Sequence, residues 1–138
     1  MALDARLGSV VMFVQQLDRS VAFYTELLGL EVTDRDATAA LLLSASGSQL
    51  ILRSMGANAP RPLGAVGVQY VIWTAAGEDD LGRCERVLRQ HGSYRETRTF
   101  EGATAVEGRD PDDVVVMITY PGPDQLPEHH LPLRIYGW

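Results

Sequence analysis

The sequence predicts an α+β fold of two βαβββ modules, whose curved mixed sheets pair and enclose a concave pocket. A strand-like run, a helix that ends at glycine and three further strand-like runs occupy residues 8–54, and the same order returns in residues 67–122. A stretch rich in proline and glycine separates the two copies, over residues 55–66. Neither copy has enough strands to bury both faces of a sheet alone, so the two are expected to form one domain.

In the first module, the β-branched and aromatic run Val10–Val14 predicts a buried strand. Apolar residues then recur at spacings of three and four over Val21–Leu28 and predict a helix, with Asp18 as its N-cap and Gly29 as its left-handed stop. The next predicted strands cover residues 30–35, 39–44 and 49–53.

In the second module, a strand is predicted over residues 67–74, and an apolar stripe predicts the following helix. That stripe consists of Leu81, Cys84, Val87 and Leu88. The remaining strands are predicted over residues 94–100, 103–107 and 114–120, with a turn at residues 110–113. The proline-rich tail, residues 123–138, is expected to run extended until the apolar stretch Leu133–Trp138 docks.

Composition limits the function. The single domain of 138 residues is 46% hydrophobic and carries a formal net charge of −6, which argues against a nucleic-acid partner. No apolar stretch approaches the ~20 residues that span a bilayer and no signal peptide is evident, so we expect a cytoplasmic protein without a membrane partner. All 12 lysine and arginine positions are arginine, which excludes a Schiff base on lysine and a lysine general base. The single cysteine, Cys84, is expected to be buried in the helix stripe.

The stretch from Leu17 to Leu30 reads Leu-Asp-Arg-Ser-Val-Ala-Phe-Tyr-Thr-Glu-Leu-Leu-Gly-Leu. It resembles the DL-x-x-S-x-x-FY-x-x-x-LG segment of the vicinal oxygen chelate superfamily. This superfamily includes glyoxalase I, extradiol dioxygenases, fosfomycin-resistance enzymes and bleomycin-type drug-binding proteins. The turn Asp110–Asp113 resembles the family's DP-x-G turn, with aspartate in place of glycine. The resemblance covers residues 8–122 and implies the same paired βαβββ fold.

Catalytic members of that family usually bind a divalent metal through His, Glu or Gln at four strand positions. The resemblance places these positions here at Ser9, Ile51, Gln69 and Met117. Isoleucine offers no donor, a thioether is a poor ligand for hard cations, and serine is weak unless deprotonated. Only Gln69 remains plausible, so the resemblance implies a member without a metal or another cofactor.

Alternation assigns the strand residues to two faces. The face expected beneath the helices is nearly all apolar and holds Val10, Met12, Val14, Leu50, Leu52, Val68, Tyr70, Ile72, Val114, Val116 and Ile118. The other face mixes apolar, aromatic and polar groups, as a pocket for an organic ligand does. Its expected ligand-binding residues are Ser9, Phe13, Gln49, Ile51, Arg53, Gln69, Val71, Trp73, Val115, Met117 and Thr119.

Phe13 and Trp73 are the expected aromatic anchors of this face, and Arg53 can pair with a carboxylate or an enolate or stack on a ring. Alternatives stay open for each. Phe13 and Met117 could fill the interior, Trp73 could pack against the tail or a partner, and Arg53 could be a solvated strand end.

These observations favour metal-independent binding and sequestration of a hydrophobic or aromatic small molecule, such as an antibiotic or another natural product, as in the self-resistance members. No catalytic residue is predicted. The alternative is an enzyme, either a metal-dependent glyoxalase or dioxygenase relative or a metal-free isomerase or cyclase that uses Gln69 with Arg53 or Tyr70 to stabilise an oxyanion. A third interpretation is a structural partner whose concave face is filled by its own side chains. The resemblance also implies a homodimer, and the linker at residues 55–66 would permit exchange of modules.

Overall fold

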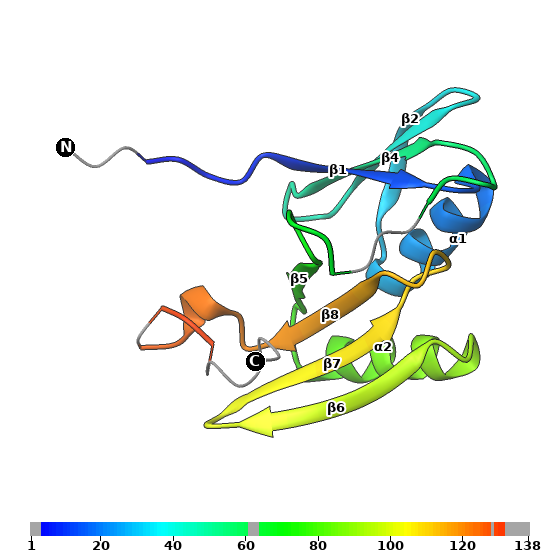
Figure 1. The fold of residues 1–138 in the computed structure, drawn as a ribbon. Helices are drawn as coiled ribbons and strands as arrows, with labels where there is room; N and C mark the ends of the chain where they lie inside the picture. Colours follow the sequence, from blue (N-terminus) through cyan, green and yellow to red (C-terminus); the bar gives the residue numbers. More distant parts are fainter. Residues whose placement is uncertain (1–3, 61–63, 128, 132–138) are drawn as a thin grey trace. The chain divides into compact units, whose positions relative to one another are not determined.

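The structure is a computed structural model that describes residues 4–60, 64–127 and 129–131. The chain divides into two compact units, with the boundary between residues 61 and 62, inside the predicted linker. Each unit contains a four-stranded mixed sheet and an α-helix in the predicted βαβββ order (Figure 1). The α+β class and the two modules are therefore confirmed. Neither described α-helix is long and apolar enough to span a membrane.

The first unit is a mixed sheet crossed by one helix. Its strand order is β1-β4-β3-β2, with β1 parallel to β4 and the other neighbours antiparallel. The parallel pair needs a long connection, which the helix and the β2–β3 hairpin provide. The elements are β1 (Ser9–Val14), α1 (Leu17–Leu28), β2 (Glu31–Arg35), β3 (Ala39–Leu43) and β4 (Gln49–Ser54).

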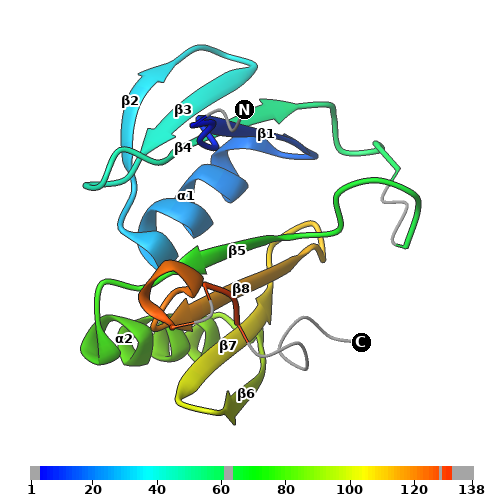
Figure 2. The same cartoon turned by 90° about the vertical axis from the view of Figure 1, so that its left-hand side faces the viewer.

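One face of this sheet is buried against α1, as Figure 2 shows. Leu50 and Leu52 of β4 and Leu27 of the helix are all fully buried. The ring of Tyr24 is also buried and packs against the ring of Phe23 in a T-shaped arrangement, with the ring centroids 5.1 Å apart. The apolar face predicted for β1 and β4 is therefore the core of the first unit.

Helix α1 lacks a side-chain cap at its N-terminus and ends at a left-handed glycine. Its N-cap is Gln16, which makes no side-chain capping hydrogen bond, so the predicted cap at Asp18 is wrong. Asp18 lies instead in the first turn, where a carboxylate favours the positive helix end, and it pairs with Arg35 of β2. At the other end, Gly29 adopts φ 64° and ends the helix as predicted.

The second unit repeats this arrangement, with strand order β5-β8-β7-β6 and β5 parallel to β8. Its elements are β5 (Val71–Thr74), α2 (Glu78–Gln90), β6 (Tyr94–Phe100), β7 (Ala103–Arg109), β8 (Val115–Tyr120) and the short 3-10 helix η1 (Pro123–Gln125). Strand β5 is half the length predicted for it. Val68, which was predicted to lie in the core, comes before the strand and is 86% exposed.

Helix α2 covers one face of the second sheet with the predicted stripe, all four members of which are buried. The close packing depends on a glycine in the sheet. A Cβ at Gly108 would lie 2.7 Å from Cδ2 of Leu88 on the helix. Since Gly108 pairs with Val116 in the ladder, the side chains of β8 that face α2 are Val116 and Ile118.

A single carboxylate organises the turn between β7 and β8. Asp110 is 5% exposed, and its Oδ1 accepts hydrogen bonds from the N–H groups of Asp112 at 2.8 Å and Val114 at 3.0 Å. Asp113 has φ 66°, a left-handed conformation in which glycine is favoured. Asp113 therefore adopts a conformation that glycine favours, at the position where the DP-x-G turn that this segment resembles has glycine.

Replacing Asp110 by alanine is expected to lower the free energy of unfolding by about 2 kcal/mol, because the buried N–H of Asp112 and the partly buried N–H of Val114 lose their acceptor. Asp110→Asn is the matched control, since its amide oxygen can accept the same bonds. Urea unfolding followed by circular dichroism measures both. Equal stability of the alanine variant and the wild type would contradict this role.

The tail docks earlier than predicted, on the face of the second sheet opposite α2. Leu131 is fully buried there, and Leu126 is partly buried beside it. The side chains that they contact, called here the tail cluster, are Ala103, Ala105, Met117, Tyr70 and Ile72. The stretch Leu133–Trp138, which was predicted to dock, lies outside the described residues.

Candidate functional site

The face of the first sheet that points away from α1, called here the open face, is arranged in rows by the strand register. The rows are Ser9, Gln49 and Leu43; then Val11, Ile51 and Leu41; then Phe13, Arg53 and Ala39. The middle row is entirely apolar, and each outer row contains polar groups. All five residues predicted for ligand binding in the first module therefore share one face.

This face is exposed although much of it is apolar. Val11 is 58% and Phe13 is 65% exposed, and Ile51 beside them is only half-buried. Side chains of this size are usually buried on a sheet, and large exposed apolar surfaces are typical of interaction sites, so this face is a candidate binding surface. At ~3.3 Å per residue, the Cα atoms of Gln49 and Arg53 lie ~13 Å apart along β4. An organic molecule of drug size lying along the strand can reach both.

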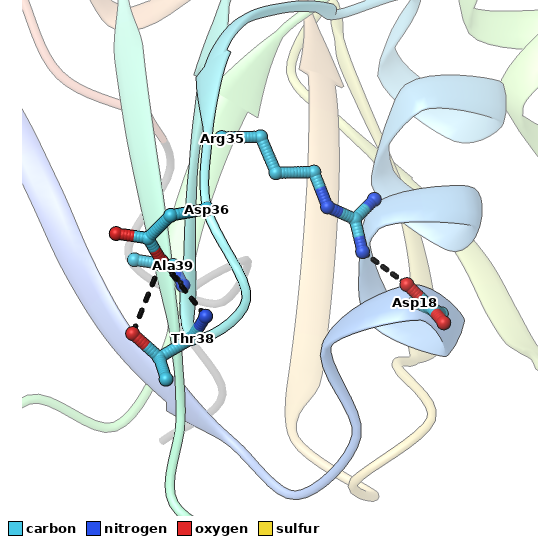
Figure 3. Close-up of polar contacts among 5 residues, drawn as sticks. All are labelled: Asp18, Arg35, Asp36, Thr38 and Ala39. Atoms are coloured by element: carbon cyan, nitrogen blue, oxygen red, sulfur yellow. Dashed lines mark hydrogen bonds and ion pairs between the residues drawn. The ribbon is translucent and has the colours of Figure 1, made fainter.

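A cleft of about 240 Å³ extends this face toward the β2–β3 turn, with Leu41 and Ile51 among its lining residues. The turn is held by Asp36, whose Oδ1 accepts hydrogen bonds from the N–H groups of Thr38 at 2.7 Å and Ala39 at 2.9 Å (Figure 3). These two bonds lower the pKa of Asp36, and the Thr38 hydroxyl and the charge of Arg53 lower it further. The cleft therefore ends at a fixed anionic turn.

The two arginines near this cleft have different roles. Arg35 pairs with Asp18 of α1 and is thus directed to the helix side of the sheet (Figure 3). Arg53 is exposed and lies opposite Phe13 in the ladder. The open face therefore presents an aromatic ring and a guanidinium as neighbours, a pair that suits a flat ligand with an acidic or carbonyl oxygen.

The observed pairing of β5 with β8 differs from the predicted register. Val71 pairs with Val116 and Trp73 pairs with Ile118, so their side chains lie on the α2 side of the sheet. The prediction that Val71 and Trp73 share a face with Met117 is wrong. The resemblance had placed Gln69 on the face of Met117, one residue away from the observed register of β5 against β8, and a shift of one residue exchanges the two faces of a strand.

The face opposite α2 therefore contains residues that were predicted to be core. Ile72 pairs with Met117 on this face, and Tyr70 belongs to the same tail cluster. The face continues into β7, where Glu107 pairs with Met117 from the other side. The predicted residue Val115 lies on this face, half-buried, together with Thr119.

The side chain of Gln69, which was predicted to bind a ligand, instead forms hydrogen bonds within its own loop. It is exposed, and its Nε2 donates hydrogen bonds to the carbonyl oxygens of Ala65 at 2.6 Å and Gly67 at 2.9 Å. With β5 in its observed register, Tyr70 rather than Gln69 precedes Ile72 on the face that holds Met117.

A divalent metal does not fit the family positions in this chain. With the corrected register they are occupied by Ser9, Ile51, Tyr70 and Met117, which offer two hydroxyls, a thioether and no carboxylate or imidazole. Such donors bind hard or borderline divalent cations poorly. Within the described ranges, no group of three or more His, Cys, Asp or Glu side chains is placed to hold a metal ion.

Met117 and Thr119 are covered by the chain itself, at 1% and 0% exposure. Met117 is part of the tail cluster, and Thr119 pairs with Ala105 of the same cluster. The Thr119 hydroxyl is buried without a hydrogen-bond partner among the described residues. In the second unit, the face predicted to bind a ligand is therefore occupied by the tail.

This face also carries a charged pair that was not predicted from the sequence. The guanidinium of Arg98 lies 3.3 Å from the carboxylate of Glu107, and both side chains are less than one-fifth exposed. Both residues lie in strands that were predicted, but the side of the sheet on which the side chains of β6 and β7 lie was not predicted. The alternation of Ala103, Ala105 and Glu107 along β7 was the available signal.

Cys84 lies in α2 and is buried, so we expect its thiol to be unreactive in the folded protein. Burial raises the pKa of its thiol to about 11, so the thiolate is scarce at neutral pH. We expect iodoacetamide at pH 8 to label Cys84 only when the second unit unfolds, whereas protein in urea reacts at once. Mass spectrometry measures the labelled fraction, and rapid labelling of folded protein would show that the thiol is accessible.

Comparisons with known proteins agree with this architecture. A family model described as the Glyoxalase/Bleomycin resistance protein/Dioxygenase superfamily matches residues 6–118. No curated protein matches the sequence. A crystal structure of a glyoxylase/bleomycin resistance protein/dioxygenase domain from Frankia sp. EAN1pec superposes with a TM-score of 0.72 at 20% identity, covering 83% of this chain and 96% of that chain.

Two further solved structures carry different activities on the same fold. Lactoylglutathione lyase from Agrobacterium tumefaciens superposes with a TM-score of 0.66 at 18% identity, covering 85% of this chain and 94% of the lyase. The fosfomycin resistance protein FosX from Mesorhizobium loti gives 0.64 at 11% identity, covering 86% and 92%. At these identities the likeness shows the fold alone. Because the family model spans most of its length, the chain belongs to the glyoxalase/bleomycin resistance protein/dioxygenase superfamily.

Proposed function

We propose that this protein binds and sequesters a hydrophobic or aromatic small molecule, such as an antibiotic or another natural product, without a metal ion. The observation that supports this most strongly is the open face of the first sheet. Val11 and Phe13 are exposed there by more than half, next to a cleft that includes Ile51. Membership of a superfamily that includes bleomycin resistance proteins is consistent with such a role.

The row arrangement indicates the chemistry of the ligand. Phe13 can stack on a flat apolar ring, and Arg53 beside it can pair with an anionic or carbonyl oxygen. At the other end of the face, Ser9 and Gln49 can orient the molecule by hydrogen bonds. The apolar middle row supplies affinity by burial of surface.

The family's metal chemistry has little support in this chain. The four positions that carry metal ligands in catalytic relatives hold side chains that bind divalent cations poorly. The residues of the open face alone therefore bind and orient the small molecule. We expect the molecule to dissociate without chemical change.

Isothermal titration calorimetry against a panel of aromatic antibiotics, in buffer with EDTA, tests the proposal. We expect at least one compound to bind with a dissociation constant of ~10 μM or tighter, and to be recovered intact by mass spectrometry. Affinity that disappears in EDTA, or a converted product, would contradict metal-independent sequestration. A panel without any binding at the open face would contradict it as well.

A metal-free enzyme is the second candidate, and Glu107 is the observation that favours it. Its carboxylate faces the same side of the second sheet as Met117 and pairs with Arg98, as a general base held in place does. Incubation of each bound compound with wild type and with Glu107→Gln separates the two functions. Product formed by the wild type and lost in the variant supports the enzyme, and no product from either supports sequestration.

We also propose that the protein acts as a homodimer, with modules exchanged between subunits. The division into two compact units joined at residues 55–66 supports such an exchange, because each unit has its own sheet and helix. Light scattering after gel filtration should give twice the chain mass of 15.1 kDa. A mass of one chain at all concentrations up to ~100 μM would contradict the dimer.

A further inference from the structure

We infer that a cleft between α2 and the second sheet binds a linear aliphatic diamine. The two ammonium groups of the diamine pair with Glu78 and Glu85, and its hydrocarbon chain lies over Gly82 between them. This goes beyond the proposed function, because the cleft lies on the α2 side of the second sheet, whereas the open face belongs to the first sheet.

The cleft, called here the helix cleft, has a volume of about 290 Å³ and lies within the second unit. It is bordered by α2, which lies behind β7 and β6 in Figure 1, and by these strands and the end of β8. Its volume is near the lower end of the ~300–1,000 Å³ range of small-molecule sites, so it suits a slender ligand. Leu81 and Val106 are buried and give the helix cleft an apolar base. The described residues that line it include two glutamates and no arginine.

The spacing of the two glutamates determines the length of the ligand. Glu78 and Glu85 are seven positions apart in α2, and both line the helix cleft. At a rise of 1.5 Å per residue, their Cα atoms lie ~10 Å apart along the helix axis. An extended chain of eight carbons holds its two terminal nitrogens at about this spacing. A dication of this length can therefore pair with both carboxylates, whereas a shorter one reaches only one of them.

Both carboxylates can accept a cation. Among the described residues, no side chain pairs with Glu78. Oε1 of Glu85 accepts a hydrogen bond from the Thr97 hydroxyl at 2.6 Å, and Oε2 accepts a longer one from Nε of Arg89 at 3.4 Å. The Thr97 hydroxyl and, to a smaller extent, Arg89 lower the pKa of Glu85, so its carboxylate is charged at neutral pH. A carboxylate has about four acceptor sites, so Glu85 retains acceptors for an ammonium group.

Gly82 indicates that the helix cleft is kept open for a ligand. Glycine inside a helix costs about 1 kcal/mol relative to alanine. The fold does not require glycine here, because a Cβ would meet only Nη1 of the flexible Arg86 side chain, at an ordinary contact distance of 3.6 Å. Gly82 borders the helix cleft between the two glutamates. Without a side chain at this position, a hydrocarbon chain can lie directly against the helix backbone.

Arg86 determines what the middle of the ligand can be. It is exposed, and its guanidinium lies near Gly82, halfway between the two glutamates. A positive charge in the middle of the ligand would be repelled by this guanidinium and would face the apolar base. The expected ligand is therefore charged at its two ends and apolar between them.

Isothermal titration calorimetry of the full chain with 1,8-diaminooctane, at low ionic strength, tests the inference. We expect saturable binding of one molecule per chain. Affinity should be at least fivefold higher than for 1,4-diaminobutane, which is too short, and for octylamine, which has one charge. Spermidine has the same length but a third charge within its chain, so it should also bind at least fivefold more weakly. Absence of saturable binding, or affinity that follows the charge of the probe with spermidine tightest, would overturn the inference.

Variants of α2 locate the bound diamine. Glu78→Gln and Glu85→Gln should each weaken 1,8-diaminooctane by about fivefold. Asp79→Asn is the matched control, since it removes the same charge from the same exposed helix turn but does not line the helix cleft. Gly82→Leu should abolish binding while urea unfolding shows a stable fold, because leucine favours a helix more than glycine does.

Equal effects of Glu78→Gln and Asp79→Asn, or undiminished binding in Gly82→Leu, would place the diamine elsewhere and overturn the inference. Phe13→Ala, which tests the open face of the first sheet, should leave the affinity for the diamine unchanged. Failure of either proposal can therefore be recognised separately.

Discussion

Replacing Gly108 by valine is expected to destabilise the second unit by about 3 kcal/mol or more. A Cβ at this position would lie 2.7 Å from Cδ2 of Leu88 and 2.8 Å from the carbonyl oxygen of Ser93. Leu88 is fully buried and the Ser93 oxygen is part of the backbone, so neither can move away without disturbing the contact between α2 and β7. Urea unfolding, together with hydrogen exchange of the β7 amides, measures the effect.

Gly82 provides the matched control within the same unit. It lies in the interior of α2, and the nearest atom to a Cβ there is Nη1 of the flexible Arg86 side chain, at 3.6 Å. Gly82→Ala is therefore expected to stabilise the protein by about 1 kcal/mol, the usual gain for this change inside a helix. Equal effects of substitutions at the two glycines would contradict the packing described for α2.

The second large effect concerns binding rather than stability. Phe13→Ala is expected to weaken the best aromatic ligand by ~10-fold to 100-fold, because the ring buries its apolar surface only when the ligand is bound. Since Phe13 is 65% exposed in the free protein, its loss should change the free energy of unfolding by no more than ~0.5 kcal/mol. Calorimetric titration gives the affinity, and urea unfolding gives the stability.

Two further variants show whether the effect belongs to the open face. Val68→Ala removes an apolar side chain that is 86% exposed in the second unit, and it should leave the affinity unchanged. Arg53→Gln should weaken ligands that carry a carboxylate or enolate and spare neutral ones, since only the former need the guanidinium. Wild-type affinity in Phe13→Ala would place the ligand elsewhere.

Local signals in the sequence were sufficient for much of this fold. The α2 stripe and the stop at Gly29 depend on residues within one element, and both are as predicted. The faces of β1 and β4 were also predicted correctly, because both strands are regular from end to end and one face of each packs on α1. The open face of the first sheet could therefore be named residue by residue from alternation alone.

Features that depend on distant partners could not be obtained in this way. The register of β5 is set by its pairing with β8, and the residues before Val71 alternate in the sequence without joining the ladder. Burial of Leu131 depends on small side chains of β7, and its own neighbours give no regular pattern. The predicted face of β5 therefore differs from the observed one by a shift of one residue against β8, and the docking of the tail at Leu131 was not predicted.

The metal content of the purified protein tests the central claim most directly. Protein isolated without chelator or metal-affinity resin should be analysed by inductively coupled plasma mass spectrometry, before and after incubation with Zn²⁺, Mn²⁺, Fe²⁺ and Ni²⁺ followed by desalting. The account predicts well below ~0.1 equivalent of any of these metals per chain, because Ser9, Ile51, Tyr70 and Met117 bind such cations poorly. About one equivalent retained through desalting would contradict it and favour the metal-dependent enzyme.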